Sequence, residues 1–84
     1  MQETDLVTAL IPAIKDQLKS KETPYVKKAF ERLIKLDDLD NEEAIKMLAL
    51  CLADETNRMF IDKRNFDALR YQVMLNALPE LPEG

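Results

Sequence analysis

Apolar residues recur at helical spacing along most of the chain, and this pattern predicts an all-α fold. The densest apolar stretch is residues 44–53, where only Lys46 interrupts a run of Ala, Ile, Met, Leu and Cys. Most of these residue types lose little rotamer freedom in a helix. A helix that is apolar on nearly every side must be covered by protein, because it is much shorter than the about 20 residues that cross a bilayer. We therefore predict a compact bundle of about four helices around a central helix over 41–61.

The first predicted helix has one apolar stripe and a proline within it. The stripe comprises Leu6, Val7, Leu10, Ile11, Ile14 and Leu18. Thr4 or Asp5 is a suitable N-cap, because a short oxygen-bearing side chain accepts from the first-turn N–H groups. Pro12 removes a backbone donor and clashes with the preceding turn, so we expect a kink or a split there.

Local signals mark the starts of the next two helices. Thr23 followed by Pro24 predicts a second helix that runs to about Leu36, because proline suits the first helical position. Asp40, with Glu43 three residues later, resembles a capping box and predicts the start of the central helix.

A fourth helix is predicted over 66–78, with Asn65 as its cap, and it carries two apolar faces. One face comprises Phe66, Leu69, Val73 and Ala77; the other comprises Tyr71, Leu75 and Leu78. A terminal helix with two apolar faces either fits between neighbours or meets a second copy of the chain. We take Tyr71, Leu75 and Leu78 as the candidate residues for a dimer or partner interface. The proline-rich tail, 79–84, is expected to be extended.

Glu55 is the most unusual residue of the central helix. At 100° per residue it falls on the same side as Leu48 and Leu52, so the pattern places a carboxylate within an apolar stripe. A buried carboxylate must be paired, be protonated or face a cavity. The first interpretation is an internal ion pair with Arg58 or Arg70, or a contact with the Tyr71 hydroxyl. The alternatives are a ligand-binding or catalytic site centred on Glu55, or exposure where the helix leaves the core.

Little else in the sequence supports catalysis. The chain has no histidine and one cysteine, Cys51, so there is no imidazole base and no thiolate metal set. The acidic run 37–43 lacks the glycine and the bidentate glutamate of a calcium loop. The only Glu-x-x-Glu spacing, Glu80 with Glu83, lies in the tail. We expect no cofactor, no metal and no catalytic residue.

Charge is distributed unevenly along the chain. Residues 1–36 carry seven basic and five acidic side chains, and residues 37–84 carry five and eleven, which gives the net charge of −4. Lys28, Arg32 and Lys35 share one face of the second predicted helix, and Lys15, Lys19 and Lys21 of the basic 15–35 region are expected nearby. Such a face suits phosphate contacts, but the acidic pI and the lack of interleaved aromatic residues favour a solvated lysine face.

Length and composition indicate one folded domain over residues 1–84. An apolar fraction of 46% is typical of globular chains, and a core of this size often needs support from oligomerisation. We read no secretory signal and no membrane span, and a single thiol fits a reducing compartment, so a cytoplasmic protein is expected.

Residues 24–82 resemble a short helical domain of uncharacterised bacterial proteins. The residues that carry the resemblance are Arg32-Leu33, Glu43-Ala44, Glu55, Phe66-Asp67, Arg70-Tyr71 and Leu78-Pro79. The resemblance implies an all-helical fold without an assigned reaction, so it transfers no catalytic residue.

The sequence favours a protein–protein interaction or scaffolding domain that acts as a homodimer through the predicted fourth helix, or that binds another protein. One alternative is a nucleic-acid-associated accessory factor that uses the basic 15–35 region, although nucleic acid is not the favoured partner. The other alternative is the enzyme or ligand-binding domain centred on Glu55.

Overall fold

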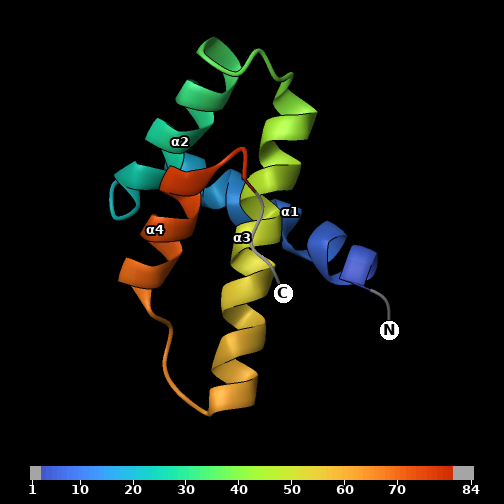
Figure 1. Cartoon of the computed structure of the whole chain (residues 1–84), viewed down its shortest axis with the longest axis vertical. Coiled ribbons are helices and arrows are strands. Elements are labelled where there is room, and N and C mark those ends of the chain that lie inside the picture. Colours follow the sequence, from blue (N-terminus) through green and yellow to red (C-terminus); the bar gives the residue numbers. More distant parts are fainter. Residues whose placement is uncertain (1–2, 81–84) are drawn as a thin grey trace.

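The all-α prediction is confirmed. A computed structural model describes residues 3–80, with side chains from residue 6 onward, and the described part contains four helices and no strand. They are α1 (Glu3–Lys19), α2 (Pro24–Lys35), α3 (Asn41–Asp62) and α4 (Ala68–Ala77). In Figure 1, α3 runs along the long axis of the molecule, α1 crosses behind it, and α2 and α4 lie on its left.

The apolar stretch of the central helix is buried, as predicted. α3 contributes six core residues, Ala44, Leu48, Ala49, Cys51, Leu52 and Ala53. Val7 and Ile14 cover them from α1, and Val26 and Leu33 from α2. Small side chains such as Ala49 and Ala53 let a crossing helix approach α3 closely, and the contact between α1 and α3 is the most extensive in the fold.

α1 is one continuous helix, so of the two predicted outcomes at Pro12, a kink or a split, the split is wrong. Pro12 is exposed, whereas Val7 and Ile14 on either side of it are buried against the core. Burial of the stripe on both sides of the proline therefore keeps the helix continuous. α1 also begins at Glu3, so Thr4 and Asp5 lie within the helix rather than at its cap.

The predicted start of α2 is correct, but its capping hydroxyl has another partner. Pro24 is the first residue of α2 and Thr23 occupies the N-cap position without a capping hydrogen bond. The Thr23 hydroxyl instead donates to the Gln17 carbonyl at 2.9 Å, which ties the start of α2 to the end of α1. At the start of α3, Asp40 Oδ1 accepts from the Glu43 N–H at 2.8 Å, as the capping pattern predicted.

α4 begins later than predicted and has a different cap. Asp67, not Asn65, occupies the N-cap position, and its Oδ1 accepts from the Arg70 N–H at 3.0 Å. Residues 81–84 of the predicted extended tail lie outside the described residues. The described part of the tail turns back instead, since the Glu80 N–H donates to the Ala77 carbonyl at 3.0 Å.

Candidate functional site

Glu55 lies at the centre of the main polar cluster in the described part of the chain. Its side chain is completely buried on α3, and each carboxylate oxygen accepts two hydrogen bonds. Oε2 accepts from Arg64 Nη1 at 2.6 Å and from the Asp67 N–H at 2.8 Å. Oε1 accepts from Arg64 Nη2 at 3.1 Å and from Arg70 Nη1 at 2.8 Å. We call Asp54, Glu55, Arg64 and Arg70 the Glu55 cluster.

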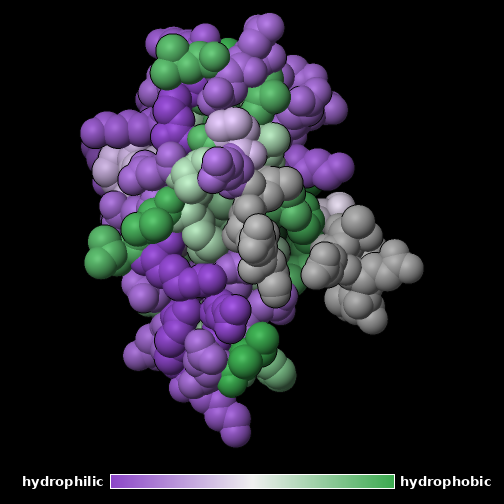
Figure 2. All heavy atoms as spheres, in the orientation of Figure 1, coloured by the Kyte–Doolittle hydropathy of each residue, from purple (hydrophilic) through white to green (hydrophobic). Residues whose placement is uncertain are grey.

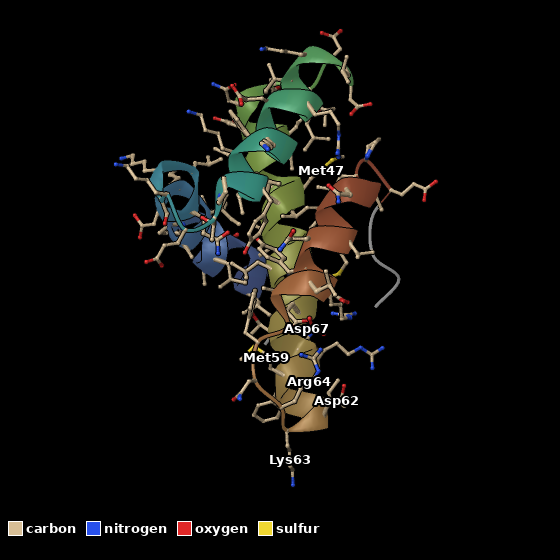
Figure 3. All side chains as sticks on the ribbon, turned by 90° about the vertical axis from the view of Figure 1, so that its left-hand side faces the viewer. Met47, Met59, Asp62, Lys63, Arg64 and Asp67 are labelled. Atoms are coloured by element: carbon tan, nitrogen blue, oxygen red, sulfur yellow. The ribbon has the colours of Figure 1, made fainter. Side chains whose placement is uncertain are left out.

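A left-handed turn at the end of α3 brings Arg64 back to Glu55. Lys63 adopts φ 52° and ψ 49°, and the Arg64 N–H donates to the Met59 carbonyl at 3.1 Å, as in a Schellman-type helix end. This reversal directs the Arg64 side chain along α3, and its guanidinium binds the carboxylate in the two-pronged manner that arginine favours. Figure 3 shows Arg64 and Asp67 alongside the C-terminal half of α3, while Lys63 projects away from its tip.

Arg70 connects the same cluster to α4. One guanidinium nitrogen, Nη1, binds Glu55, and the other, Nη2, lies 2.6 Å from Asp54 Oδ2. Two half-buried guanidinium groups therefore compensate the buried charge of Glu55, and each also pairs with a second carboxylate, Asp62 for Arg64 and Asp54 for Arg70. The cluster fixes the α3–α4 loop and the first turn of α4 onto α3.

The environment of Glu55 keeps it ionised. The side-chain hydrogen bonds from Arg64 have the largest effect and, with those from the Asp67 N–H and Arg70, outweigh desolvation and lower the pKa of Glu55 to about 2. A general acid needs a proton at neutral pH, and a ligand site needs a free lone pair or an open face. Glu55 has neither, so its geometry is that of a structural ion pair.

The sequence identified one of the two arginines that hold Glu55. Arg70 is confirmed as a partner, whereas Arg64 was missed because it lies beyond the end of α3 and returns only through the left-handed Lys63. Arg58 forms no ion pair with Glu55 in the described structure. The Tyr71 hydroxyl, the third candidate, donates to Gln17 Oε1 at 2.7 Å instead.

The prediction that one apolar face of the fourth helix forms a dimer or partner interface is wrong for the three residues that we assigned to it. Tyr71, Leu75 and Leu78 are all buried in the core of this chain. The Tyr71 ring makes edge-to-face contacts with Tyr25 and Phe66, at centroid distances of 6.0 and 5.4 Å. Periodicity alone could not separate the two faces of α4, because both are apolar and only the docking of α4 decides which one is covered.

The opposite side of α4 is the exposed one. Leu69 is 72% exposed and Val73 61%, and Ala77 is exposed one turn further along. We call Leu69, Val73 and Ala77 the α4 outer face. Since residues four apart lie on the same side of a helix, these three side chains form a continuous apolar strip.

The three residues of the predicted basic face, Lys28, Arg32 and Lys35, do not form one exposed basic surface. Arg32 Nη2 donates to the carbonyls of Leu75 and Leu78, at 2.8 and 2.9 Å, and so satisfies acceptors at the end of α4. Lys28 and Lys35 remain exposed. Arg32 therefore belongs to the fold and not to a surface for phosphates.

Lys28 instead shares a shallow hollow with three other lysines where α1 meets α2. The hollow has a volume of about 350 Å³ and is lined by Leu18, Lys19, Ser20, Lys21, Pro24, Lys27, Lys28 and Glu31. We call this hollow the basic corner. The sequence indicated three of its lysines, Lys19, Lys21 and Lys28, but grouped them with Arg32 and Lys35, because the turn between the helices could not be placed from the pattern.

Cys51 is buried in the core, and burial raises the pKa of its thiol to about 12. Among the described residues no group of three or more Cys, Asp or Glu side chains is arranged to hold a metal ion. None of the described helices is both long and apolar enough to cross a membrane.

The resemblance of residues 24–82 to uncharacterised bacterial domains remains a prediction. Comparison of the chain with protein families, with curated proteins and with solved structures gives no match.

Proposed function

We propose that this protein is a protein–protein interaction domain and that it acts as a homodimer through the α4 outer face. The observation that carries the proposal is the exposure of Leu69 and Val73, two large aliphatic side chains one turn apart on one helix. Large apolar side chains gathered on one surface favour contact with another protein surface. In Figure 2 a hydrophobic area lies over α4, and a second one lies over the lower end of α3.

A second copy is the partner that best fits this strip. In a two-fold symmetric contact the same residues meet from both sides, so Leu69 of one protomer would pack near Val73 of the other. The strip is apolar over its whole length, and a copy of itself is therefore complementary to it. Because α4 has only ten residues, the interface is small, and we expect a reversible dimer in the micromolar range rather than an obligate one.

The other two functions have weaker support. A catalytic or ligand-binding role for Glu55 would require an accessible carboxylate, but both oxygens are already used by arginine and backbone donors. A nucleic-acid role would require an extended basic surface, but Arg32 is engaged with the end of α4. We also propose a reducing compartment such as the cytoplasm, since the single, buried thiol of Cys51 suits it.

Sedimentation equilibrium from low to high micromolar protein tests the proposal. We expect the wild-type mass to rise from monomer towards dimer. Leu69→Glu should abolish this rise, because two like charges would meet across the two-fold axis. An acidic residue is compatible with the first turn of α4, so the monomer should stay folded.

Leu36→Glu is the matched control. Leu36 is 77% exposed at the end of α2, so the variant makes the same chemical change at an equally accessible leucine outside the α4 outer face. It should dimerise as the wild type does. A wild-type protein that stays monomeric at high micromolar concentration, or a dimer that Leu69→Glu leaves intact, would overturn the proposal.

A further inference from the structure

The basic corner is a positively charged hollow whose lysine side chains form no ion pair in the described structure. Lys19, Lys21, Lys27 and Lys28 are all exposed, and none of them forms an ion pair within the described structure. Three of the four described arginines, Arg32, Arg64 and Arg70, are in contrast bound to acceptors of the fold. Four ammonium groups against the single carboxylate of Glu31 leave an excess of positive charge around one hollow.

We propose that the basic corner binds a compact, multiply charged phosphate group, such as the phosphate chain of an oligophosphate or a nucleotide. Lysine ammonium groups are mobile point charges that suit phosphate oxygens. The lining converges from two directions, with Lys19 at the end of α1, Lys21 in the turn after it, and Lys27 and Lys28 on α2. An anion in the hollow can therefore contact lysines on both sides.

The local structure of the corner also favours an anion. α2 starts here, and its positive helix end adds to the lysine charges. Thr23 occupies the N-cap position of α2, but its hydroxyl donates to the Gln17 carbonyl of α1 and makes no capping hydrogen bond to α2. Leu18 and Pro24 contribute apolar surface to the lining, which limits hydration of a bound group on that side.

The charge of the rest of the molecule favours a compact ligand over a long polyanion. Residues 37–84 carry eleven acidic and five basic side chains. A nucleic-acid strand extending from the corner across the molecule would meet this net negative charge, whereas a short phosphate chain would remain among the four lysines. The proposed ligand class therefore differs from the nucleic-acid alternative.

Titration of the ¹⁵N-labelled protein with sodium tripolyphosphate, followed by amide chemical shifts, tests the inference. We expect the largest shift changes within residues 18–31 and an affinity that falls with added salt, because exposed charges are screened. Lys28→Glu should weaken binding about tenfold, since it replaces an attraction by a repulsion at contact distance. Lys46→Glu, the same change at an exposed lysine on α3, should leave the affinity within about twofold of wild type, because it lies outside the lining of the hollow.

Three outcomes would overturn the inference. One is the absence of saturable shifts, and another is equal weakening by Lys28→Glu and Lys46→Glu. The third is tighter binding of a single-stranded oligonucleotide than of tripolyphosphate, which would support the nucleic-acid alternative instead. The Leu69→Glu variant should bind tripolyphosphate as the wild type does, so the result does not depend on whether the chain dimerises.

Discussion

Arg64 Nη1 lies 2.6 Å from Oε2 of Glu55, nine residues earlier in the chain, so a residue just beyond the end of α3 is bound to a buried side chain of that helix. With Arg70 on α4 donating to the other oxygen, Glu55 connects three consecutive parts of the fold: α3, the loop after it and α4. The apolar side of α4 packs in the core through Tyr71 and Leu75, and this ion pair adds a polar attachment at the first turn of the helix.

The stability of the protein should depend on the ionisation of Glu55. The pKa of Glu55 is lowered from 4.5 to about 2 on folding, so the unfolded state takes up a proton first as the pH falls. The resulting stabilisation, about 3 kcal/mol, is fully present above pH 4.5 and is lost as the pH falls towards 2. Urea unfolding followed by circular dichroism at a series of pH values measures this loss.

Glu55→Gln supplies the comparison for the pH series. At neutral pH it should lower the free energy of unfolding by about 3 kcal/mol, because it leaves two arginines without their buried partner. Its stability should also vary less with pH between 4.5 and 2 than that of the wild type. Glu31→Gln, the same change at an exposed position, should alter stability by less than about 0.5 kcal/mol. If the free energy of unfolding depended on pH equally in the wild type and in Glu55→Gln, Glu55 would not be the source of the pH dependence.

Arg32 should stabilise the C-terminal end of α4. Arg32→Met keeps a long apolar stem but removes the donors to the Leu75 and Leu78 carbonyls, and we expect a loss of about 1–2 kcal/mol. Hydrogen exchange of the α4 amides should become faster. Lys35→Met, at an exposed position of the same helix, should leave α4 exchange unchanged, and equal effects of both substitutions would contradict this role.

Lys63 adopts a left-handed backbone conformation, φ 52°, that glycine reaches without steric cost. Lys63→Gly should therefore raise the free energy of unfolding by about 1 kcal/mol. Lys46→Gly, within the second turn of α3, should lower it by a similar amount, about 1 kcal/mol, because glycine is a poor helix former there. Thermal and urea unfolding of the two variants should give opposite signs; the same sign would contradict the assigned backbone role of Lys63.

Cys51 should be chemically inert in the folded protein. Its thiol is buried and burial is the main cause of its pKa of about 12, so almost no thiolate is present at neutral pH. A thiol reagent such as Ellman's reagent should react only as fast as the protein unfolds, and rapidly in denaturant. Fast reaction of the native protein would show that α3 is more open at this point than the structure indicates.

Polar residues divide into those whose role was predictable and those whose role was not. Asp40 could be assigned as a cap because its partner, Glu43, lies within one turn. Asp67 also caps a helix locally, through the Arg70 N–H, but the bond from its own N–H to Glu55 spans twelve residues and no local pattern contains it. The Arg32 contact with Leu78 spans 46 residues, and no local pattern contains it.

The sequence by itself determined the helices, the burial of α3 and the need for Glu55 to find a partner, because helical periodicity and the cost of a buried charge are local properties. Only the tertiary structure decided which face of α4 is covered, which arginines reach Glu55 and which lysines gather at the basic corner. These depend on how the turns at Thr23 and Lys63 orient successive helices, and a turn's direction is set by contacts between residues far apart in the chain.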